Sequence, residues 1–384
     1  MLDDARRLAP RFAARAADSD RDGSFPERDF AELREAGFFG LMVPARLGGA
    51  GAGFAEYADI AYELARGNGS TALVFNMHAS VTGAIAGVTD ELAELLGLPA
   101  EALEARDGFL KAAAGGAWYA VAMSERGAGS RLSELSTTYR RVEGGFRITG
   151  AKTFCSGAGH ADAYLIAARS ADDPAQVSQF LVPAGAGLRV EPTWDALGMR
   201  ATGSHDLHVD VTVPAPALLG GVEGLALVAA QLAPHWMVAS YAAVYVGVAR
   251  AAVDAAVEHV NARGLGRLPA VRARIGRADA AVSAAHLVVR EAARRVDGAP
   301  GEPETNRWVW RAKLLAGTTA AEVAAAMLEA AGTSAMRRGH PLERLYRDAR
   351  AGSLQPATSD VCADWLGVDA LGGDPDADGV APRW

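Results

Sequence analysis

The sequence predicts a multidomain α+β protein: an N-terminal helical domain, a middle β-barrel or sandwich domain, and a C-terminal four-helix bundle. Three observations lead to this prediction. Apolar residues recur at helical spacing early in the chain, alternate with polar residues near its middle, and return to helical spacing afterwards. The expected domains span residues 1–115, 116–222 and 223–384. A chain of 384 residues is long enough to form more than one domain.

The first block places its apolar residues at helical intervals. Phe30, Leu33 and Phe38 recur at roughly helical spacing in ERDFAELREAGFFG, which ends at Gly40. The following stretch STALVFNMHASVTGAIAGV is apolar on nearly all sides, which is typical of a helix buried within a domain. The whole block is therefore expected to be helical.

The period changes near Trp118, where strand-like runs begin. TTYRRVEGGFRITGAKTF contains a Glu-Gly-Gly turn between two such runs, which predicts a hairpin. In HDLHVDVTVP the apolar residues alternate with polar ones, which indicates a half-buried strand with Leu207, Val209, Val211 and Val213 facing inward. This block is expected to be rich in β structure.

Helical spacing returns from Gly224 onward. The stretches MVASYAAVYVGVARAAVDAAVEHV and ETNRWVWRAKLLAGTTAAEVAAAMLEAA are long and rich in small residues, which allow helices to pack closely. Four or five antiparallel helices joined by short loops form a bundle, and this is the architecture we expect here.

Composition and charge restrict the classes of function. A formal net charge of −8 argues against broad nucleic-acid binding, which requires a basic face. The two cysteines, Cys155 and Cys362, give neither a disulfide framework nor metal-ligand spacing. The N-terminus lacks the apolar core of a signal peptide, and no apolar run is expected to be long enough to span a bilayer. These features predict a cytoplasmic protein without a metal site.

Two glycine-rich stretches require interpretation. LGGAGAGF, from Leu47 to Phe54, is similar to a dinucleotide-binding loop, but no βαβ series surrounds it, which favours a flexible loop. AMSERGAGS, from Ala122 to Ser130, has three interpretations: a phosphate loop, the seat of a nucleophilic serine, or the wall of a cofactor pocket. It lacks the lysine of a phosphate loop and the strand-turn-helix setting of a nucleophile elbow.

Four stretches carry motifs that occur together in one order. Met123 to Ser130 corresponds to Leu-Thr-Glu-Pro-x-Ala-Gly-Ser, and residues 150–157 correspond in part to Gly-x-Lys-x-Trp-Ile-(Ser/Thr)-Asn. Residues 197–204 match Leu-Gly-x-Arg-x-Thr-Gly-Ser, and residues 346–350 match Tyr-Arg-Asp-Ala-Lys. Through these motifs nearly the whole chain resembles the acyl-CoA dehydrogenase superfamily.

The resemblance implies that FAD lies between the β domain and the C-terminal bundle, so AMSERGAGS is interpreted as a flavin wall. Hydroxyls and backbone amides there can bind the pyrimidine edge and N5 region of a flavin and tune its electronics. Phe154 occupies the position at which the family often has a Trp, and its ring can stack on the flavin ring system. The flavin-binding residues expected in the β domain are Met123, Ser124, Gly129, Ser130, Phe154 and Ser156.

In this family a neighbouring subunit completes the FAD site, which implies a homodimer or homotetramer. NARGLGR partly matches Arg-x-x-Phe-Gly and leaves Arg263 as a candidate pyrophosphate ligand. LEAAGTS keeps Gly332 of a Gln-x-Gly-Gly pattern. Thr358 remains from Thr-Ser-Gln, in which Asp360 replaces the glutamine.

The residues that carry the family's reaction differ here. Family dehydrogenases use a glutamate to remove a proton from Cα of an acyl thioester, and Pro356 occupies the place of that glutamate. In another branch the glutamate lies on the first helix of the bundle, where the alignment puts Met237. His235 and Val238 stand in place of the Asp and Arg that help bind the CoA moiety.

Three functions fit these observations. The favoured prediction is α,β-dehydrogenation of an acyl thioester on CoA or a carrier protein, with an electron-transfer flavoprotein as partner. The first alternative is a two-component monooxygenase that receives reduced flavin from a flavin reductase and needs no Cα base. The second is a non-catalytic flavin-binding protein. His78 is the candidate catalytic base, because a neutral imidazole accepts protons near pH 7; its alternative role is that of a satisfied core histidine.

Overall fold

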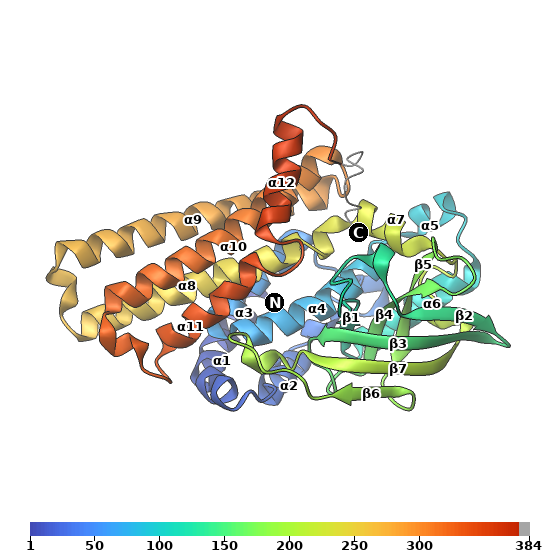
Figure 1. The fold of residues 1–384 in the computed structure, drawn as a ribbon, viewed down its shortest axis with the longest axis horizontal. Coiled ribbons are helices and arrows are strands. Elements are labelled where there is room, and N and C mark those ends of the chain that lie inside the picture. Colours follow the sequence, from blue (N-terminus) through green and yellow to red (C-terminus); the bar gives the residue numbers. More distant parts are fainter. Residues whose placement is uncertain (376–384) are drawn as a thin grey trace.

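The computed structural model describes residues 1–375 and confirms the predicted fold class: helices, then a β domain, then a helical bundle (Figure 1). The N-terminal helices are α1 (Leu2–Asp22), α2 (Glu27–Glu35), α3 (Phe54–Gly67), α4 (Gly69–Ala86), α5 (Asp90–Leu95) and α6 (Ala100–Ala114). The strands are β1 (Tyr119–Ala122), β2 (Thr138–Val142), β3 (Gly145–Cys155), β4 (Ala163–Ser170), β5 (Val177–Pro183), β6 (Leu188–Glu191) and β7 (His205–Pro214). The later helices are α7 (Leu225–Leu232), α8 (Ala239–Ala262), α9 (Pro269–Gly298), α10 (Pro303–Ala331), α11 (Pro341–Ala349) and α12 (Ser359–Ala370).

The middle domain is built on one sheet, which has seven strands in the described chain. Its order is β1-β4-β2-β3-β7-β6, and β5 pairs with β4. The predicted hairpin is present, because Val142 of β2 pairs with Gly145 of β3 across the turn. Strand β3 also pairs with β7 over most of its length, and the register shifts between Lys152 and Cys155. Such a bulge bends a strand and re-aims the side chains next to it.

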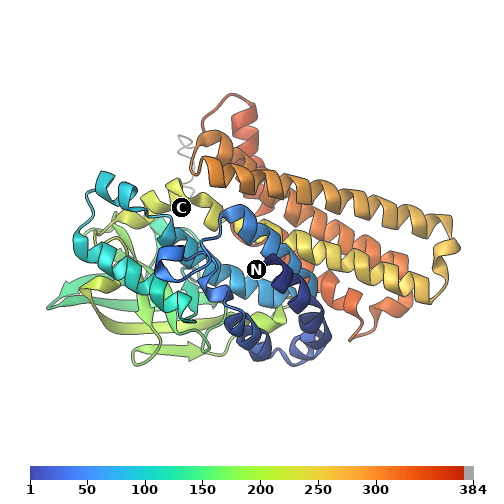
Figure 2. The same cartoon turned by 180° about the vertical axis from the view of Figure 1, so that it is seen from behind.

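The N-terminal helices fill the space between the sheet and the bundle (Figure 2). Helix α4 is apolar nearly all round and is buried as predicted, because it contacts β1 on one side and α8 on another. It begins where the Asn68 side chain accepts a hydrogen bond from the Ser70 amide, an N-cap that satisfies one free backbone donor. Helix α3 packs on α8 and α9. The N-terminal domain thereby joins the other two.

Two helical segments are long and apolar enough, by length and composition, to cross a membrane: Pro234–Ala262 and Pro303–Ala331. The prediction that no apolar run reaches this length is therefore wrong. Their alanine-rich sequences are suited to close packing between helices, and 83% and 56% of the two most apolar windows are buried inside the protein. A buried core helix passes the same test, so these segments are weak evidence for a membrane span.

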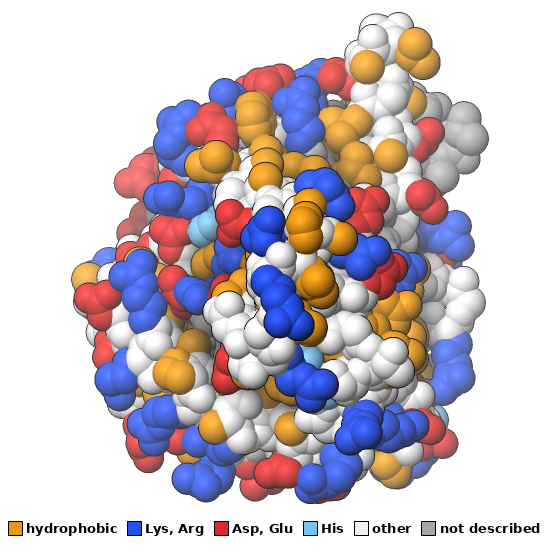
Figure 3. All heavy atoms as spheres, turned by 90° about the vertical axis from the view of Figure 1, so that its left-hand side faces the viewer, with side chains coloured by type: hydrophobic (Ala, Val, Ile, Leu, Met, Phe, Trp, Pro, Cys, Tyr) orange, Lys and Arg blue, Asp and Glu red, His pale blue; other side chains and the backbone are white. Residues whose placement is uncertain are grey.

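The end of the bundle carries mixed charge. Figure 3 shows this face, on which Lys and Arg side chains alternate with Asp and Glu and leave small hydrophobic groups between them. The basic side chains do not gather into one broad area on this face. Nucleic-acid binding relies on such an area, so this face offers no support for it.

Candidate functional site

A central cavity of about 860 Å³ lies where the three domains meet. We call the part contributed by the end of β1 and the loop after it the β wall; it comprises Val121, Met123, Ser124 and Ser130. We call the part contributed by the start of α8 and the turn before it the helical wall; it comprises His235, Trp236, Met237 and Tyr241. Most of the remaining lining is apolar, from α4, α6 and α7, and includes Val81, Ile85, Leu103, Phe109, Leu225 and Val228.

The loop of the β wall folds back on itself. The backbones of Glu125 and Gly129 exchange two hydrogen bonds of 2.9 Å, which closes a short turn. Gly127 and Gly129 have φ angles of 95° and 63°, and nothing lies within 4 Å of a Cβ built at either position. The glycines therefore serve the backbone conformation, which other residues rarely adopt, rather than a close approach. The turn presents Ser124 and Ser130 to the cavity.

A buried ion pair fixes this loop to strand β3. Lys152 Nζ lies 2.7 Å from Glu125 Oε1 and donates a second, longer hydrogen bond to the Met123 carbonyl. Glu125 also accepts hydrogen bonds from the amides of Ser136 and Thr137. Burial alone raises the pKa of Glu125, but Lys152 and these donors outweigh it and hold the pKa at about 2. The carboxylate is therefore charged and fully engaged at neutral pH.

Glu125 and Lys152 each lie within a family motif, and the motifs alone do not reveal that the two side chains form a pair. The sequence does contain one indication of the pair: the first family motif has an acidic residue, and the next motif has a lysine. A further hydrogen bond of 2.9 Å, from the Thr153 amide to the Ser124 carbonyl, joins the same two stretches. The structure therefore brings residues 123–130 and residues 150–157 together, as the flavin prediction requires.

Phe154 lies in the β3 bulge and is unusual in two respects. Its φ is 55°, a left-handed conformation that costs an aromatic residue energy, and its side chain is 63% exposed. The ring meets that of Trp194 edge to face, with the centroids 6.0 Å apart. Ser156 follows, and its hydroxyl shares a hydrogen bond of 2.9 Å with Ser204. A strained, outward-facing aromatic ring is typical of a binding surface.

These observations fit a flavin. A flavin ring requires an apolar face to stack on and hydrogen-bonding groups along its edges. The exposed Phe154 ring supplies the first, and the hydroxyls of Ser124, Ser130 and Ser156 supply the second. Phe154 and Ser156 do not themselves line the central cavity, whereas Ser124 and Ser130 do. The residues that would hold the ring therefore extend from the cavity to the surface of the sheet.

His78 lies on α4 and is fully committed to the backbone. Its Nε2 donates to the Phe39 carbonyl at 2.8 Å, and its Nδ1 accepts from the Tyr119 amide at 3.0 Å. Burial lowers the pKa of His78 to about 4, so the ring is neutral. It does not line the cavity, although its neighbour Met77 does. This geometry supports the alternative role of a satisfied core histidine and leaves no ring nitrogen for a substrate proton.

His235 is a second buried histidine. Unlike His78, it lines the cavity and has a ring nitrogen without a partner among the described residues. It lies in the 3₁₀ turn Pro234–Trp236 directly before α8, is 6% exposed and lines the cavity. Its Nδ1 is buried and has no hydrogen-bond partner among the described residues. Burial lowers its pKa to about 4 as well. In the sequence this position is marked by nothing more than the replacement of the family's aspartate.

The cavity contains one carboxylate among the described residues that line it, that of Asp297. Its two oxygens accept hydrogen bonds from the amides of Phe54 and Ala55, at 2.6 and 3.0 Å, and so cap the start of α3. Pro356 and Met237, at the two places where relatives carry a glutamate, both line the cavity. The cavity therefore offers no free carboxylate base within the described chain.

Lys313 of α10 fixes the segment that carries Pro356. Its side chain is completely buried, and its ammonium group donates to the carbonyls of Gly352, Gln355 and Ala357 at 2.8–3.0 Å. Burial lowers the pKa of Lys313 to about 8. Three carbonyl acceptors satisfy all three donors of the ammonium group, so this lysine acts on the loop and not on a ligand.

The four remaining predicted residues lie at helix ends of the bundle and not at the cavity. Arg263 directly follows α8, and Gly332 follows α10 with a φ of 79°. Thr358 caps α12 by accepting a hydrogen bond from the Val361 amide, and Asp360 lies in the first turn of that helix. Their predicted contact with a flavin depends on a second subunit and stays a prediction.

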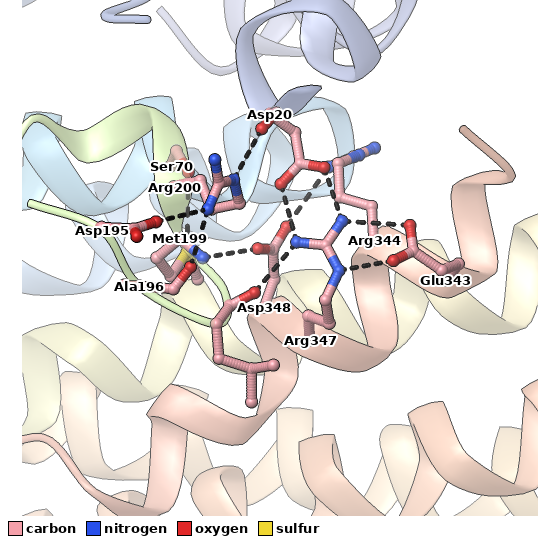
Figure 4. Close-up of polar contacts among 11 residues, drawn as sticks. Asp20, Ser70, Asp195, Ala196, Met199, Arg200, Glu343, Arg344, Arg347 and Asp348 are labelled. Carbon is pink, nitrogen blue, oxygen red and sulfur yellow. Dashed lines mark hydrogen bonds and ion pairs between the residues drawn. The ribbon is translucent and has the colours of Figure 1, made fainter. Parts of the chain in front are cut away.

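The fourth motif has a structural role. Asp348 accepts a hydrogen bond from the Met199 amide at 2.6 Å, and Arg347 donates to the Leu197 carbonyl at 3.0 Å and pairs with Asp20 of α1 (Figure 4). The third and fourth motifs therefore lock one loop of the β domain to α11 and to the N-terminal helix. These charged residues point toward one another and not into the central cavity.

The fold and the site together define a class of protein: three-domain proteins in which a β sheet and two helical domains meet at one large cavity, beside residues that fit a flavin. Comparison with known families makes this specific. Residues 1–93, 120–212 and 239–359 match the N-terminal, middle and C-terminal domains of acyl-CoA dehydrogenases. The chain belongs to the acyl-CoA dehydrogenase superfamily.

Individual relatives differ in their activities. The chain is 28% identical to the putative acyl-CoA dehydrogenase YdbM of Bacillus subtilis, over 95% of both chains. It is 33% identical to L-evernosamine nitrososynthase of Micromonospora sp., over 98% of this chain and 91% of the relative. Among solved structures, TdsC of Paenibacillus sp. A11-2 in complex with FMN and indole shares 25% identity and a TM-score of 0.85, over 97% of this chain and 96% of TdsC.

Proposed function

We propose that the protein is a two-component monooxygenase that uses reduced flavin from a partner reductase to oxygenate a small, largely apolar molecule. One observation carries this proposal: within the described residues, the cavity lacks a free carboxylate that could remove a proton from Cα. Dehydrogenation of an acyl thioester requires such a base within reach of the substrate. The proposal therefore favours the first alternative over the dehydrogenation that the family resemblance suggested.

The relatives support this choice. A nitrososynthase is among the relatives above 30% identity, and TdsC was solved with FMN and indole in one complex. An apolar cavity of about 860 Å³ is large enough for an aromatic molecule beside a flavin ring. Because the relative YdbM is a putative acyl-CoA dehydrogenase, dehydrogenation is the second candidate activity.

Reduced flavin, when bound, supplies the electrons with which O₂ is activated. The residues of the chain have three other tasks. Ser124, Ser130 and Phe154 bind and orient the ring, and the pair of Glu125 and Lys152 keeps their loop in place. The apolar lining excludes water and holds the substrate. An apolar enclosure also limits side reactions of activated oxygen with solvent.

The cofactor is proposed as a flavin whose ring is recognised by the β wall. FAD is the family expectation, and FMN accompanies TdsC. The two share the isoalloxazine ring and differ in the adenosine part, for which the predicted ligands Arg263, Gly332, Thr358 and Asp360 come from a second subunit. We therefore propose that the protein forms a homodimer or homotetramer. Its proposed partner is a flavin reductase, and its proposed location is the cytoplasm.

An anaerobic titration separates the two activities. The protein is reconstituted with FAD or with FMN and mixed with butyryl-CoA or octanoyl-CoA, while the oxidised flavin absorbance is followed. We expect no bleaching by the thioesters, and we expect tighter binding of reduced than of oxidised flavin. Bleaching by either thioester would contradict the proposal, because it requires a base that the cavity is proposed to lack.

A further inference from the structure

Strand β5 contributes a polar side chain to the apolar face of the sheet that borders the cavity. Val121 of β1 lies opposite Leu165 of β4, and Leu165 lies opposite Leu181 of β5, so the three side chains share one face. Val121 and Leu165 line the cavity, which identifies this face as the cavity side. Gln179 is two residues from Leu181 along β5, and side chains two apart in a strand point to the same face. The Gln179 side chain is therefore directed to the cavity, and Gln179 is one of its lining residues.

The side-chain amide of Gln179 is unengaged and accessible. Its backbone carbonyl accepts a hydrogen bond from the Leu219 amide, whereas its side chain has no hydrogen-bond partner among residues 1–375. Gln179 is half-buried, and its amide atoms are not among the fully buried atoms that lack a partner. A ligand in the cavity can therefore reach both the oxygen and the nitrogen of this amide.

The charged side chains that line the cavity, within the described residues, are already paired. Arg106 donates to the Val88 carbonyl and to Asp90, both at 2.7 Å. The two oxygens of Asp297 accept hydrogen bonds from backbone amides at the start of α3. Neither residue offers a free charge to an ionic ligand, and burying an unpaired charge is strongly unfavourable. The cavity is therefore suited to a neutral ligand.

The chemistry of an amide side chain defines the group that pairs with it. A primary amide has a carbonyl oxygen that accepts hydrogen bonds and an NH₂ group that donates two. The lining residues nearest in the sheet and its edge, Val121, Leu165 and Leu219, are aliphatic and offer no side-chain hydrogen bond. A ligand group that both donates and accepts satisfies the amide, whereas an apolar group leaves it desolvated without a partner.

We propose that Gln179 is a specificity-determining residue of the cavity and that it selects substrates whose apolar body carries one neutral amide or hydroxyl group. This inference rests on the proposed monooxygenase function and names a substrate class for it. The amide or hydroxyl group pairs with the Gln179 side chain, and the aliphatic lining holds the rest of the molecule. The residue binds the substrate and takes no part in the activation of O₂.

Two probes of nearly equal shape test the inference: hexanamide, and 2-heptanone, in which a methyl group replaces the NH₂ group. Their dissociation constants are measured by ligand-observed NMR titration on the flavin-reconstituted protein without reductase, so that no turnover occurs. Failure of the monooxygenase proposal, which the thioester titration detects, is then distinguishable from failure of this inference. The quantity compared is the dissociation constant of hexanamide divided by that of 2-heptanone, because the two probes also differ in hydration.

The matched variants are Gln179→Leu and Gln176→Leu, the same substitution at a lining residue and at a residue that does not line the cavity. Hexanamide can form one more hydrogen bond with Gln179 than 2-heptanone can. We therefore expect Gln179→Leu to raise the ratio of dissociation constants about 10-fold and Gln176→Leu to leave it unchanged. Thermal unfolding verifies that both variants are folded.

The inference is overturned if Gln179→Leu leaves the ratio unchanged while the protein is folded, because the side chain then makes no selective contact. It is also overturned if the wild-type protein binds neither probe. An equal rise of the ratio in Gln176→Leu would overturn it as well, since the effect would then not arise from the cavity.

Discussion

The β wall and the helical wall of the cavity differ in how their buried polar groups are satisfied. Behind the β wall, Glu125, Lys152 and His78 all have partners at hydrogen-bonding distance. On the helical wall, His235 has the same low pKa as His78 but an unpaired nitrogen. Burial and a shifted pKa therefore do not identify a ligand-binding residue on their own.

The largest effect is expected where the β wall is most fully partnered. Lys152→Met leaves Glu125 charged and buried without its cation, which should lower the free energy of unfolding by about 3–5 kcal/mol. Urea denaturation measures this loss, and flavin binding should fall with it. Lys111→Met, which removes an exposed lysine, should change stability by no more than about 0.5 kcal/mol. Equal losses in both variants would show that the ion pair does not hold the loop.

The next prediction compares the two histidines directly. His78→Phe leaves the Phe39 carbonyl and the Tyr119 amide without partners, at a cost of about 2–4 kcal/mol. His235→Phe removes an unpaired nitrogen and should leave stability unchanged or slightly higher. Thermal and urea unfolding of the two variants test this contrast. It would be broken if His235→Phe destabilised the protein as much as His78→Phe.

The dependence of stability on acidic pH tests the same comparison. For both histidines the folded pKa of about 4 lies below the ordinary value of 6.5, so the unfolded chain binds more protons between these limits. Stability should therefore fall as pH drops from 6.5 to 4. His235→Phe should reduce the loss between pH 7 and pH 4.5 by about 2 kcal/mol. An unchanged loss in this variant would mean that the His235 ring is not buried in its neutral form.

A smaller effect is expected at Phe154, whose ring is exposed and whose backbone is left-handed. Phe154→Gly relieves the backbone strain and should leave stability within about 1 kcal/mol of the wild type. Flavin affinity should nevertheless fall about 10-fold, because the stacking ring is lost. Phe154→Trp introduces the ring that relatives often carry and should preserve binding. Unaltered flavin affinity in Phe154→Gly would remove this residue from the site.

The arrangement of domains could be predicted from the sequence because each block has its own apolar period. Helix α4 could be recognised as buried because its own residues are apolar on nearly all sides. The β2–β3 hairpin could be recognised from its Glu-Gly-Gly turn. Both signals are local, and local patterns are what a single sequence displays best. The four family motifs added the prediction of a flavin wall, and the structure joins its two stretches, residues 123–130 and 150–157, through hydrogen bonds.

The roles of the histidines could not be predicted in the same way. The two hydrogen-bond partners of His78 lie 39 and 41 positions away from it in the sequence, and no local pattern reveals them. The His235 ring packs on Phe54 of α3, which lies about 180 residues earlier in the sequence. The bulge that exposes Phe154 is likewise a property of pairing between β3 and β7. These features arise from tertiary contacts, which sequence spacing does not encode.

The most direct test of the account is a crystal structure of the protein with FMN and indole bound. The account predicts that the flavin ring contacts Ser124 and Phe154 and that the indole lies in the central cavity beside the flavin ring. A flavin bound away from the β wall, or an indole bound outside the central cavity, would contradict it.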